Sequence, residues 1–294
     1  MLKNPRCQVI ALEEHYWDRE LAGQYSDADA IRDPELSRRL YDLGELRIRE
    51  MDEAGIDVQV ISHGAPSTQR LSGDGAMQLT RRVNDRLHAA IAANPQRFAA
   101  FAALPTCDPT AAAGELERTV ELGFKGAMIH GLANGLFVDD RRFWPIFECA
   151  ERLDVPIYLH PSVQHPAVME AYYQDYARDF PMVIRAAWGF TVETATQAIR
   201  LVLSGVFDAH PRLKVILGHL GETLPFLVWR IDQALARPGQ KALSFRDIFC
   251  RHFYITTSGN LSNPALLCCM MEMGIDHLLF AVDRPFVQNR AGTQ

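Results

Sequence analysis

Near the N-terminus the sequence reads Ile10-Ala-Leu-Glu-Glu-His-Tyr16, a short apolar run that ends in charged side chains. In a strand, residues two positions apart point to the same face, so Glu13 and His15 are expected to face one way. A carboxylate and an imidazole at the mouth of a sheet provide half of a divalent metal site. An E-x-H pair alone is more often a surface feature, so this prediction depends on further ligands at the ends of other strands.

Short apolar runs alternate with helical patterns along the whole chain. The expected strands are residues 8–12, 57–61, 98–103, 125–129, 156–159, 213–217, 253–256 and 278–282. This alternation predicts an α/β fold of the (β/α)8 TIM barrel type, whose chemistry lies at the carboxyl ends of the strands. A doubly wound open sheet is the alternative, but no Gly-x-Gly-x-x-Gly or P-loop pattern follows any of the runs.

The intervals between the strands carry helical periodicity and turn signals. The expected helices are residues 36–54, 79–94, 110–122, 143–153, 167–178, 192–204, 224–236 and 264–273. The polar segment around Gly23 and Asp33-Pro34 is predicted to be a long loop. A length of 294 residues suits one barrel domain over 1–294, which would lack the helix that usually follows the last strand.

The composition is that of an ordinary globular protein, with 48% hydrophobic and 22% charged residues. A formal net charge of −6 and the absence of a basic run argue against a nucleic-acid partner. We expect no membrane span and no signal peptide, and therefore a cytoplasmic protein. The 6 cysteines show neither CxxC nor finger spacing, so we expect reduced packing residues without a catalytic role.

Few polar residues directly follow the predicted strands, and most of them are metal-binding or acid–base side chains. They are Glu13 and His15 after the first strand, His160 after the fifth, His219 after the sixth and Asp283 after the eighth. Because the carboxyl ends of barrel strands meet at one mouth, we expect these five side chains to converge. The alternative, that all five are unrelated strand-end polar groups, requires several coincidences.

Two further histidines also follow predicted strands. His63 and His130 either line the substrate pocket or are loop histidines bonded to the backbone, and the second reading is the commoner one. We predict that His63 contributes to substrate binding. The remaining histidines at 165, 210, 252 and 277 stand beside Pro or Asp in loops or at element starts, where surface roles are expected.

The chain resembles the metal-dependent aromatic decarboxylase branch of the amidohydrolase superfamily, which includes γ-resorcylate, 2,3-dihydroxybenzoate and 5-carboxyvanillate decarboxylases. Four motifs carry the likeness: Ala-Leu-Glu-Glu-His at 11–15, Val-Pro-Ile-Tyr-Leu-His-Pro at 155–161, Leu-Gly-His-Leu-Gly-Glu with Trp-Arg-Ile-Asp at 217–232, and Phe-Ala-Val-Asp-Arg-Pro-Phe at 280–286. They recur in order at barrel spacing. The resemblance spans almost the whole chain.

The resemblance implies that one divalent ion is bound by Glu13, His15, His160 and Asp283. It also implies that His219 lies close by with support from Glu222, and that Arg230 contacts the carboxylate or phenolate of the substrate. Classical hydrolases of the superfamily have His-x-His where this chain has Glu-x-His, which favours the aromatic decarboxylases. An added anionic ligand suits Zn²⁺ or Mn²⁺ without deciding between them.

The sequence departs from the family pattern at two places. Arg284 follows Asp283 where the family usually has an aromatic residue, which puts the pocket charge in doubt. The chain also ends soon after Asp283, without the expected final helix. We predict that apolar surface near the last strand is covered by another subunit, in a homodimer or homotetramer.

These features predict a non-oxidative, metal-dependent decarboxylase of an ortho-hydroxybenzoate, with Asp283 as proton donor and His219 and Glu222 as further catalytic residues. Metal-assisted hydrolysis of a lactone or amide would use the same residues. A barrel that binds a metal or aromatic acids without turnover is the third reading.

Overall fold

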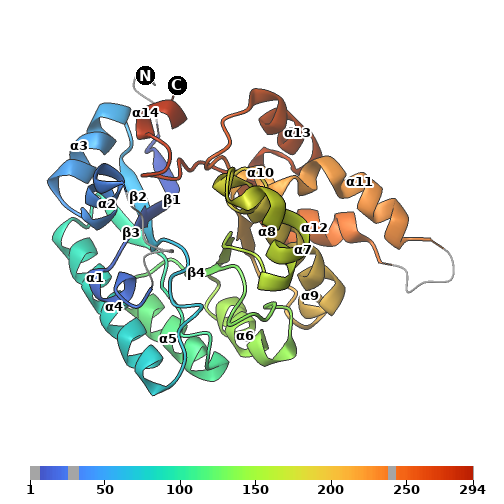
Figure 1. Ribbon diagram of the computed structural model, residues 1–294, viewed down its shortest axis with the longest axis horizontal. Helices are drawn as coiled ribbons and strands as arrows, with labels where there is room; N and C mark the ends of the chain where they lie inside the picture. The colour runs from blue at the N-terminus through green and yellow to red at the C-terminus, as the bar shows by residue number, and fades with distance from the viewer. Residues whose placement is uncertain (1–6, 26–32, 238–242, 294) are drawn as a thin grey trace.

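The computed structural model describes residues 7–25, 33–237 and 243–293, and places parallel strands at the centre with helices around them (Figure 1). The strands are β1 (Ile10–Tyr16), β2 (Val58–His63), β3 (Phe98–Ala100), β4 (Ala127–His130), β5 (Ile157–His160), β6 (Val215–Leu217), β7 (Phe253–Thr256) and β8 (Leu278–Leu279). All the paired strands run parallel. Each of these strands overlaps a strand predicted from the sequence.

The strands close into a barrel. Hydrogen bonding gives the orders β1-β2-β3 and β4-β5-β6-β7-β8, and two isolated parallel bridges join these runs. Ala102 pairs with Ala127 beyond the end of β3, and Leu12 of β1 pairs with Ala281 beyond β8. The bridges leave neither run with a free edge, so the (β/α)8 prediction is confirmed and the doubly wound open sheet is excluded.

Alternation along each strand divides the core into two layers. In β5, Ile157 and Leu159 point outward into the layer between strands and helices, while Tyr158 points into the barrel interior. The interior cluster consists of Val60, Phe101, Met128, Tyr158 and Ile216. Large side chains from successive strands therefore fill the barrel, which leaves the carboxyl ends of the strands as the place for a site.

The larger helices agree with the predicted ones to within a few residues. They are α4 (Asp74–Ala93), α5 (Pro109–Glu121), α6 (Trp144–Arg152), α7 (Pro166–Ala177), α8 (Gly189–Ser204), α11 (Leu224–Leu235) and α13 (Asn263–Met273). The short elements η1 (Arg141–Phe143), η2 (Pro181–Ile184) and η3 (Ile275–His277) are 3-10 turns. Helices α1 (Arg19–Ala22), α9 (Val206–Ala209), α10 (His219–Glu222) and α12 (Phe245–His252) were not predicted.

The single helix predicted over 36–54 is wrong, because the segment forms α2 (Pro34–Tyr41) and α3 (Glu45–Ala54). Asp42 has extended backbone angles between the two helices, and its carboxylate accepts hydrogen bonds from the amides of Gly44 and Arg47. These bonds satisfy amides at the start of α3 and fix the turn. Part of the loop predicted after β1 forms α1, and its residues 26–32 lie outside the described residues.

The last strand is shorter than predicted, because the backbone amides that follow it donate to side chains and not to the carbonyl groups of a neighbouring strand. The amide of Ala281 donates to the hydroxyl of Thr257 at 3.1 Å, and the amide of Val282 donates to Glu14 at 3.0 Å. A short helix follows, α14 (Asn289–Gly292), and its Gly292 packs against Val282. Val282 is fully buried, while Leu278, Leu279 and Phe280 are partly buried and Phe286 is 50% exposed.

No helix among the described residues is long and apolar enough to span a membrane. The described cysteines are all free, and Cys149 and Cys269 are buried, as packing residues are expected to be.

Candidate active site

A bulge in β1 brings Glu13 and His15 together. The pairing of β1 with β2 shifts register between Ala11 and Glu14, and Glu13 has a φ of 60°. A positive φ at a residue other than glycine is uncommon and clusters at functional sites. The two side chains converge, with His15 Nε2 4.0 Å from Glu13 Oε1, although through this bulge and not through the regular alternation predicted.

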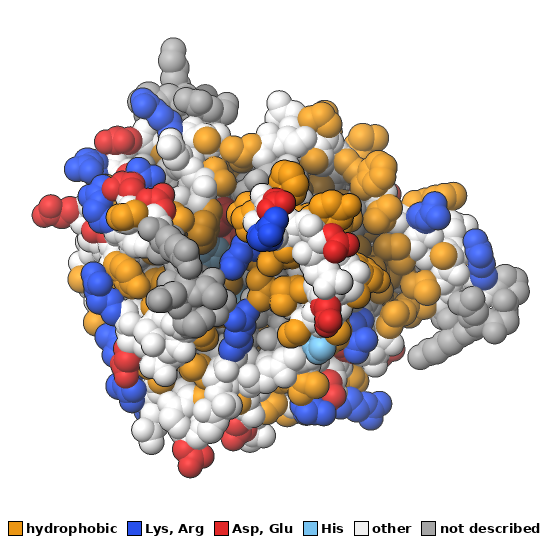
Figure 2. Space-filling model, viewed as in Figure 1, with side chains coloured by type: hydrophobic (Ala, Val, Ile, Leu, Met, Phe, Trp, Pro, Cys, Tyr) orange, Lys and Arg blue, Asp and Glu red, His pale blue; other side chains and the backbone are white. Residues whose placement is uncertain are grey.

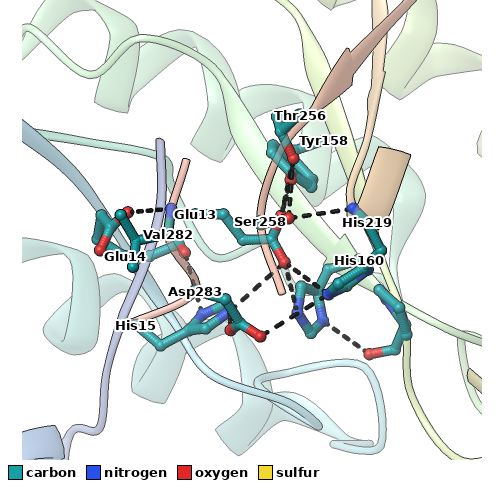
Figure 3. Close-up of polar contacts among 12 residues, drawn as sticks. Glu13, Glu14, His15, Tyr158, His160, His219, Thr256, Ser258, Val282 and Asp283 are labelled. Atoms are coloured by element: carbon teal, nitrogen blue, oxygen red, sulfur yellow. Dashed lines mark hydrogen bonds and ion pairs between the residues drawn. The ribbon is translucent and has the colours of Figure 1, made fainter. Parts of the chain in front are cut away.

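Three hydroxyl groups hold the far oxygen of the Glu13 carboxylate (Figure 3). Tyr158 and Ser258 donate short hydrogen bonds to Oε2, and Thr256 donates to the same atom at 3.3 Å. Burial alone would raise the pKa of Glu13, but the nearby histidines, His219 above all, lower it to about 2. Glu13 is therefore an ionised carboxylate whose Oε1 has no hydrogen-bond partner within the described chain.

His160 and Asp283 complete a group of four ligands. His160, the last residue of β5, donates from Nδ1 to the carbonyl of Pro161 at 2.7 Å, which leaves Nε2 as an acceptor 3.2 Å from Glu13 Oε1. Asp283 has a φ of 75° and places Oδ1 3.4 Å from Nε2 of His15. The ligand atoms of Glu13, His15, His160 and Asp283 all lie within 4.8 Å of one another.

This group fits a divalent metal ion. Oε1 of Glu13, Nε2 of His15 and Oδ1 of Asp283 are buried atoms without a hydrogen-bond partner among the described residues, and they face one point. Leaving several buried polar atoms unsatisfied costs free energy unless something else binds them. Two carboxylates and two imidazoles form a donor set that Zn²⁺ and Mn²⁺ accept.

His219 and Glu222 form a hydrogen-bonded pair beside the four ligands. Nδ1 of His219 donates to Oε1 of Glu222 at 2.6 Å, while its Nε2 lies 3.3 Å from Glu13 Oε1 and 3.8 Å from Asp283 Oδ2. Burial would lower the pKa of His219, but Glu222 and Glu13 raise it well above its ordinary value. The two carboxylates thus favour the protonated form of His219 in this arrangement.

The backbone around this pair has a conformation that few sequences adopt. His219, Leu220, Glu222 and Thr223 all have positive φ. Gly259, with a φ of 62°, passes so close that a Cβ there would stand 2.7 Å from His219. Such backbone persists only where its surroundings enforce it, and here it holds His219 over the ligand group.

The two carboxylates of the ligand group differ in ionisation. Burial raises the pKa of Asp283, while the nearby imidazole of His219 opposes this shift. Glu13, by contrast, has its pKa held at about 2. Asp283 is therefore the carboxyl group of this site that can be protonated and can donate.

His63 and His130 are buried near the site with fixed tautomers. His63 donates from Nδ1 to the carbonyl of Gly64 at 2.8 Å, its ring stacks on Trp17, and burial lowers its pKa to about 4. The ring of His130 lies 4.8 Å from that of His160. Both histidines keep an Nε2 without a partner among the described residues, and neither lines the cavity described below.

Two predicted arginine features lie away from the ligands. Arg230 is exposed on α11 and does not line the cavity of its own chain. Arg284 is buried and turns away from the pocket, where it donates to Glu50 at 3.0 Å and to the carbonyl of Arg39 at 2.9 Å. Arg284 thus stabilises the contact between the end of the barrel and helices α2 and α3, and the expected change in pocket charge does not arise from it.

A cavity of about 1200 Å³ opens over the ligand group. His160, His219, Glu222 and Asp283 line its polar part. Much of the remaining wall is apolar and includes Trp17, Met182, Trp188, Phe190, Phe226 and Phe286. A polar, metal-competent end and apolar walls suit a ligand that has an acidic group on an aromatic ring.

Comparison with known proteins agrees with this geometry. The family model described as amidohydrolase matches residues 13–294. The chain belongs to the amidohydrolase family. Among curated members of this family, a gamma-resorcylate decarboxylase of Polaromonas sp. is 41% identical over 296 residues, covering 94% of this chain and 88% of the relative. The resemblance drawn from the four motifs is thus confirmed.

Solved structures of amidohydrolase-family decarboxylases share the fold over nearly the full chain. A 2,6-dihydroxybenzoate decarboxylase in complex with 2,6-dihydroxybenzoate is 38% identical, with a TM-score of 0.88 over 97% of this chain and 91% of that one. A dihydroxybenzoic acid decarboxylase of Polaromonas sp. with bound manganese and 2-nitroresorcinol is 40% identical, with a TM-score of 0.87 over 97% and 89%.

The sequence analysis did not identify the hydroxyl side chains that hold Glu13 in place. Tyr158, Thr256 and Ser258 hold Glu13, yet each looks like an ordinary strand residue in the sequence. Ser258 also accepts a hydrogen bond from the amide of His219 at 3.1 Å, so it connects two parts of the site. The one available signal was position, because Thr256 and Ser258 stand at the carboxyl end of a predicted strand and alternate as inward-facing residues do.

Proposed function

We propose that this protein is a metal-dependent, non-oxidative decarboxylase of an ortho-hydroxybenzoate-type aromatic acid. The observation that carries the proposal is the convergence of Glu13, His15, His160 and Asp283 on one point, with His219 beside them. Membership in the amidohydrolase family and the decarboxylase relatives support the same activity.

Glu13, His15, His160 and Asp283 would hold one divalent ion, either Mn²⁺ or Zn²⁺. Manganese is bound in the related decarboxylase structure from Polaromonas sp.. When bound, such an ion would supply positive charge that stabilises the negative charge developing on the substrate oxygens. The hydroxyl donors on Glu13 bind its Oε2 and leave Oε1 facing the other three ligand atoms, as neighbouring groups around metal ligands commonly do.

Asp283 supplies the proton that the reaction needs. Loss of CO2 breaks the bond between the ring carbon and the carboxylate, and the electron pair of that bond ends as a new C–H bond on the ring. The two oxygens of Asp283 face different partners, Oδ1 toward His15 and Oδ2 toward His219. One oxygen can therefore remain at the ligand group while the other carries the proton to the ring carbon.

His219 and Glu222 determine the charge around Asp283. A cationic His219 beside Asp283 stabilises the carboxylate that remains after proton transfer. Glu222 orients His219 through their hydrogen bond and maintains its charge. We therefore keep His219 and Glu222 as the further catalytic residues of this proposal.

The predicted substrate contacts of His63 and Arg230 remain proposals. The ring of His63 is buried and stacks on Trp17, which lines the cavity. His63 would therefore affect substrate binding indirectly, by fixing the position of Trp17. Arg230 lies outside the cavity of its own chain, so it could meet substrate only in the cavity of another subunit. That arrangement would require the predicted homodimer or homotetramer.

Exposed apolar side chains on α11 and α13 support an oligomer. Phe226, Trp229 and Met271 are 80%, 67% and 86% exposed, and these two helices pack side by side. Figure 2 shows hydrophobic side chains gathered on this side of the molecule. A surface of this kind commonly marks an interface. We therefore propose that the interface lies on α11 and α13 and not at the end of the last strand.

We also propose that the protein is cytoplasmic, as expected from the sequence.

The test follows the fate of the carboxylate in D2O. Metal-loaded protein incubated with hydroxybenzoates should release CO2 and place deuterium on the ring carbon that lost the carboxylate. Asp283→Asn keeps the shape and one ligand oxygen but cannot donate an acid proton, so its turnover should fall about 10²-fold or more while substrate still binds.

Two other outcomes would point to the other readings. Hydrolysis of a lactone or amide, with oxygen from labelled water in the product and no CO2, would replace the decarboxylase by a hydrolase. Tight binding of aromatic acids without any product would indicate a binding protein.

A further inference from the structure

Arg185 lies on the wall of the cavity in the segment between η2 and α8. Its main chain is fixed on both sides, because its amide donates to the carbonyl of Met182 at 3.0 Å and its carbonyl accepts from the amides of Trp188 and Phe190. The segment also rests on the loop after β5, where Gln164 donates to the carbonyl of Ile184 at 3.1 Å. Arg185 is therefore held at a defined place relative to β5.

Arg185 is the one lysine or arginine among the described residues that line the cavity. Its guanidinium has no hydrogen bond or ion pair within the described parts of the chain. Other arginines on the nearby surface are paired, for example Arg200 with Asp139 and Arg178 with Asp179. The carboxylates in the cavity wall, Glu222 and Asp283, are both engaged with His219.

The surroundings of Arg185 favour an anionic partner from a ligand. Met182, Trp188 and Phe190 line the cavity beside it, and apolar neighbours lower the local dielectric constant and so strengthen charge–charge attraction. A guanidinium binds a carboxylate through two parallel hydrogen bonds. The cavity, at about 1200 Å³, is larger than the roughly 300–1,000 Å³ usual for small-molecule sites, so it has room beyond a single chelated ring.

We propose that Arg185 binds a second carboxylate of the substrate, distant from the one that the metal ligands receive. This inference rests on the decarboxylase function proposed above and narrows its substrate class to hydroxybenzoic acids with a second acidic group, on the ring or on a short side chain. The reaction removes the carboxylate at the metal ligands and leaves the one bound by Arg185 in place. Arg185 is thus a specificity-determining residue.

The experiment compares two probes that share the same ortho-hydroxybenzoate end. The monoacid is salicylate, and the diacid is 4-hydroxyisophthalate, which adds a second carboxylate across the ring. Manganese-loaded wild type, Arg185→Gln, Arg185→Lys and the control Arg178→Gln are measured for kcat, for KM and, by calorimetry, for binding. Arg178 is a suitable control because it is nearby, is 90% exposed and does not line the cavity.

We expect wild type to prefer the diacid. Arg185→Gln should raise KM for the diacid about 10- to 100-fold with little change in kcat, and should leave the monoacid unaffected. Arg185→Lys should keep part of the preference for the diacid, since lysine retains the positive charge but lacks the planar guanidinium that binds a carboxylate through two hydrogen bonds. Arg178→Gln should behave as wild type.

Two results would overturn the inference: a wild type that binds both probes equally, or an Arg185→Gln variant that loses both probes to the same extent. Failure of the proposed function is distinguishable from both. If neither probe is decarboxylated but the diacid binds more tightly and loses that advantage in Arg185→Gln, the role of Arg185 is supported and the decarboxylase reading fails for these probes.

Discussion

Replacing Tyr158 by Phe should weaken metal binding without unfolding the barrel. Tyr158 fills the barrel interior and donates its hydroxyl to Oε2 of Glu13, so the change removes one of three donors on that oxygen and little volume. Loss of a group that orients a metal ligand typically costs about 10- to 100-fold in metal affinity. Because Thr256 and Ser258 still donate to Glu13, we expect the lower figure, about 10-fold, for the single variant.

The double variant Tyr158→Phe with Ser258→Ala should approach the upper figure, about 100-fold. Ser258 also accepts from the amide of His219, so the double variant should in addition reduce turnover in the fully metal-loaded protein. The assay is a Mn²⁺ titration against a competing chelator, read alongside the melting temperature of the metal-free protein.

A matched control is available on the adjacent part of the barrel. Tyr254→Phe removes the same hydroxyl from β7, where the tyrosine packs against the interior cluster without contacting Glu13. It should leave the metal affinity unchanged. Equal metal affinity in wild type and both Tyr158 variants would refute the reasoning that these hydroxyls orient Glu13. A loss of metal affinity in Tyr254→Phe as large as that in Tyr158→Phe would also refute it.

Three further predictions concern the ligand set, the pH dependence of stability and the assembly. His160→Ala removes one of four ligands and should lose the metal as well as activity; a full equivalent of metal in the purified variant would exclude His160 as a ligand. The pKa of His63 is lowered to about 4 in the fold, so the unfolded chain takes up a proton first as the pH falls, and stability should drop by about 3 kcal/mol between pH 6.5 and 4. The free energy of unfolding is measured by urea denaturation at each pH. In His63→Gln it should change much less between pH 6.5 and 4, whereas the half-buried control His88→Gln should behave as wild type. Light scattering should give an oligomer that Trp229→Glu dissociates, and a monomeric wild type at micromolar concentration would contradict the interface on α11 and α13.

The order of strands and helices and the polar residues that gather at the barrel mouth could be predicted from the sequence. Both depend on local rules, because apolar periodicity identifies each element and a barrel collects the residues that follow its strands at one mouth. Glu13, His15, His160, His219 and Asp283 are therefore recognisable one by one, since each stands directly after an apolar run, whereas the choice of four of them as metal ligands came from the family resemblance. The break between α2 and α3 was missed although its signal is also local, a capping Asp42 followed by Gly44.

Tertiary structure alone decided how these ligands are held and which other side chains act with them. The bonds from Tyr158 and Ser258 to Glu13 join residues 145 and 245 positions apart, and no local pattern records such pairs. The same holds for Arg284, which looked like a pocket charge beside Asp283 but bonds to Glu50. The physical reason is that the direction of a side chain at the barrel mouth depends on bulges, positive φ angles and packing between distant strands, which arise only when the barrel closes.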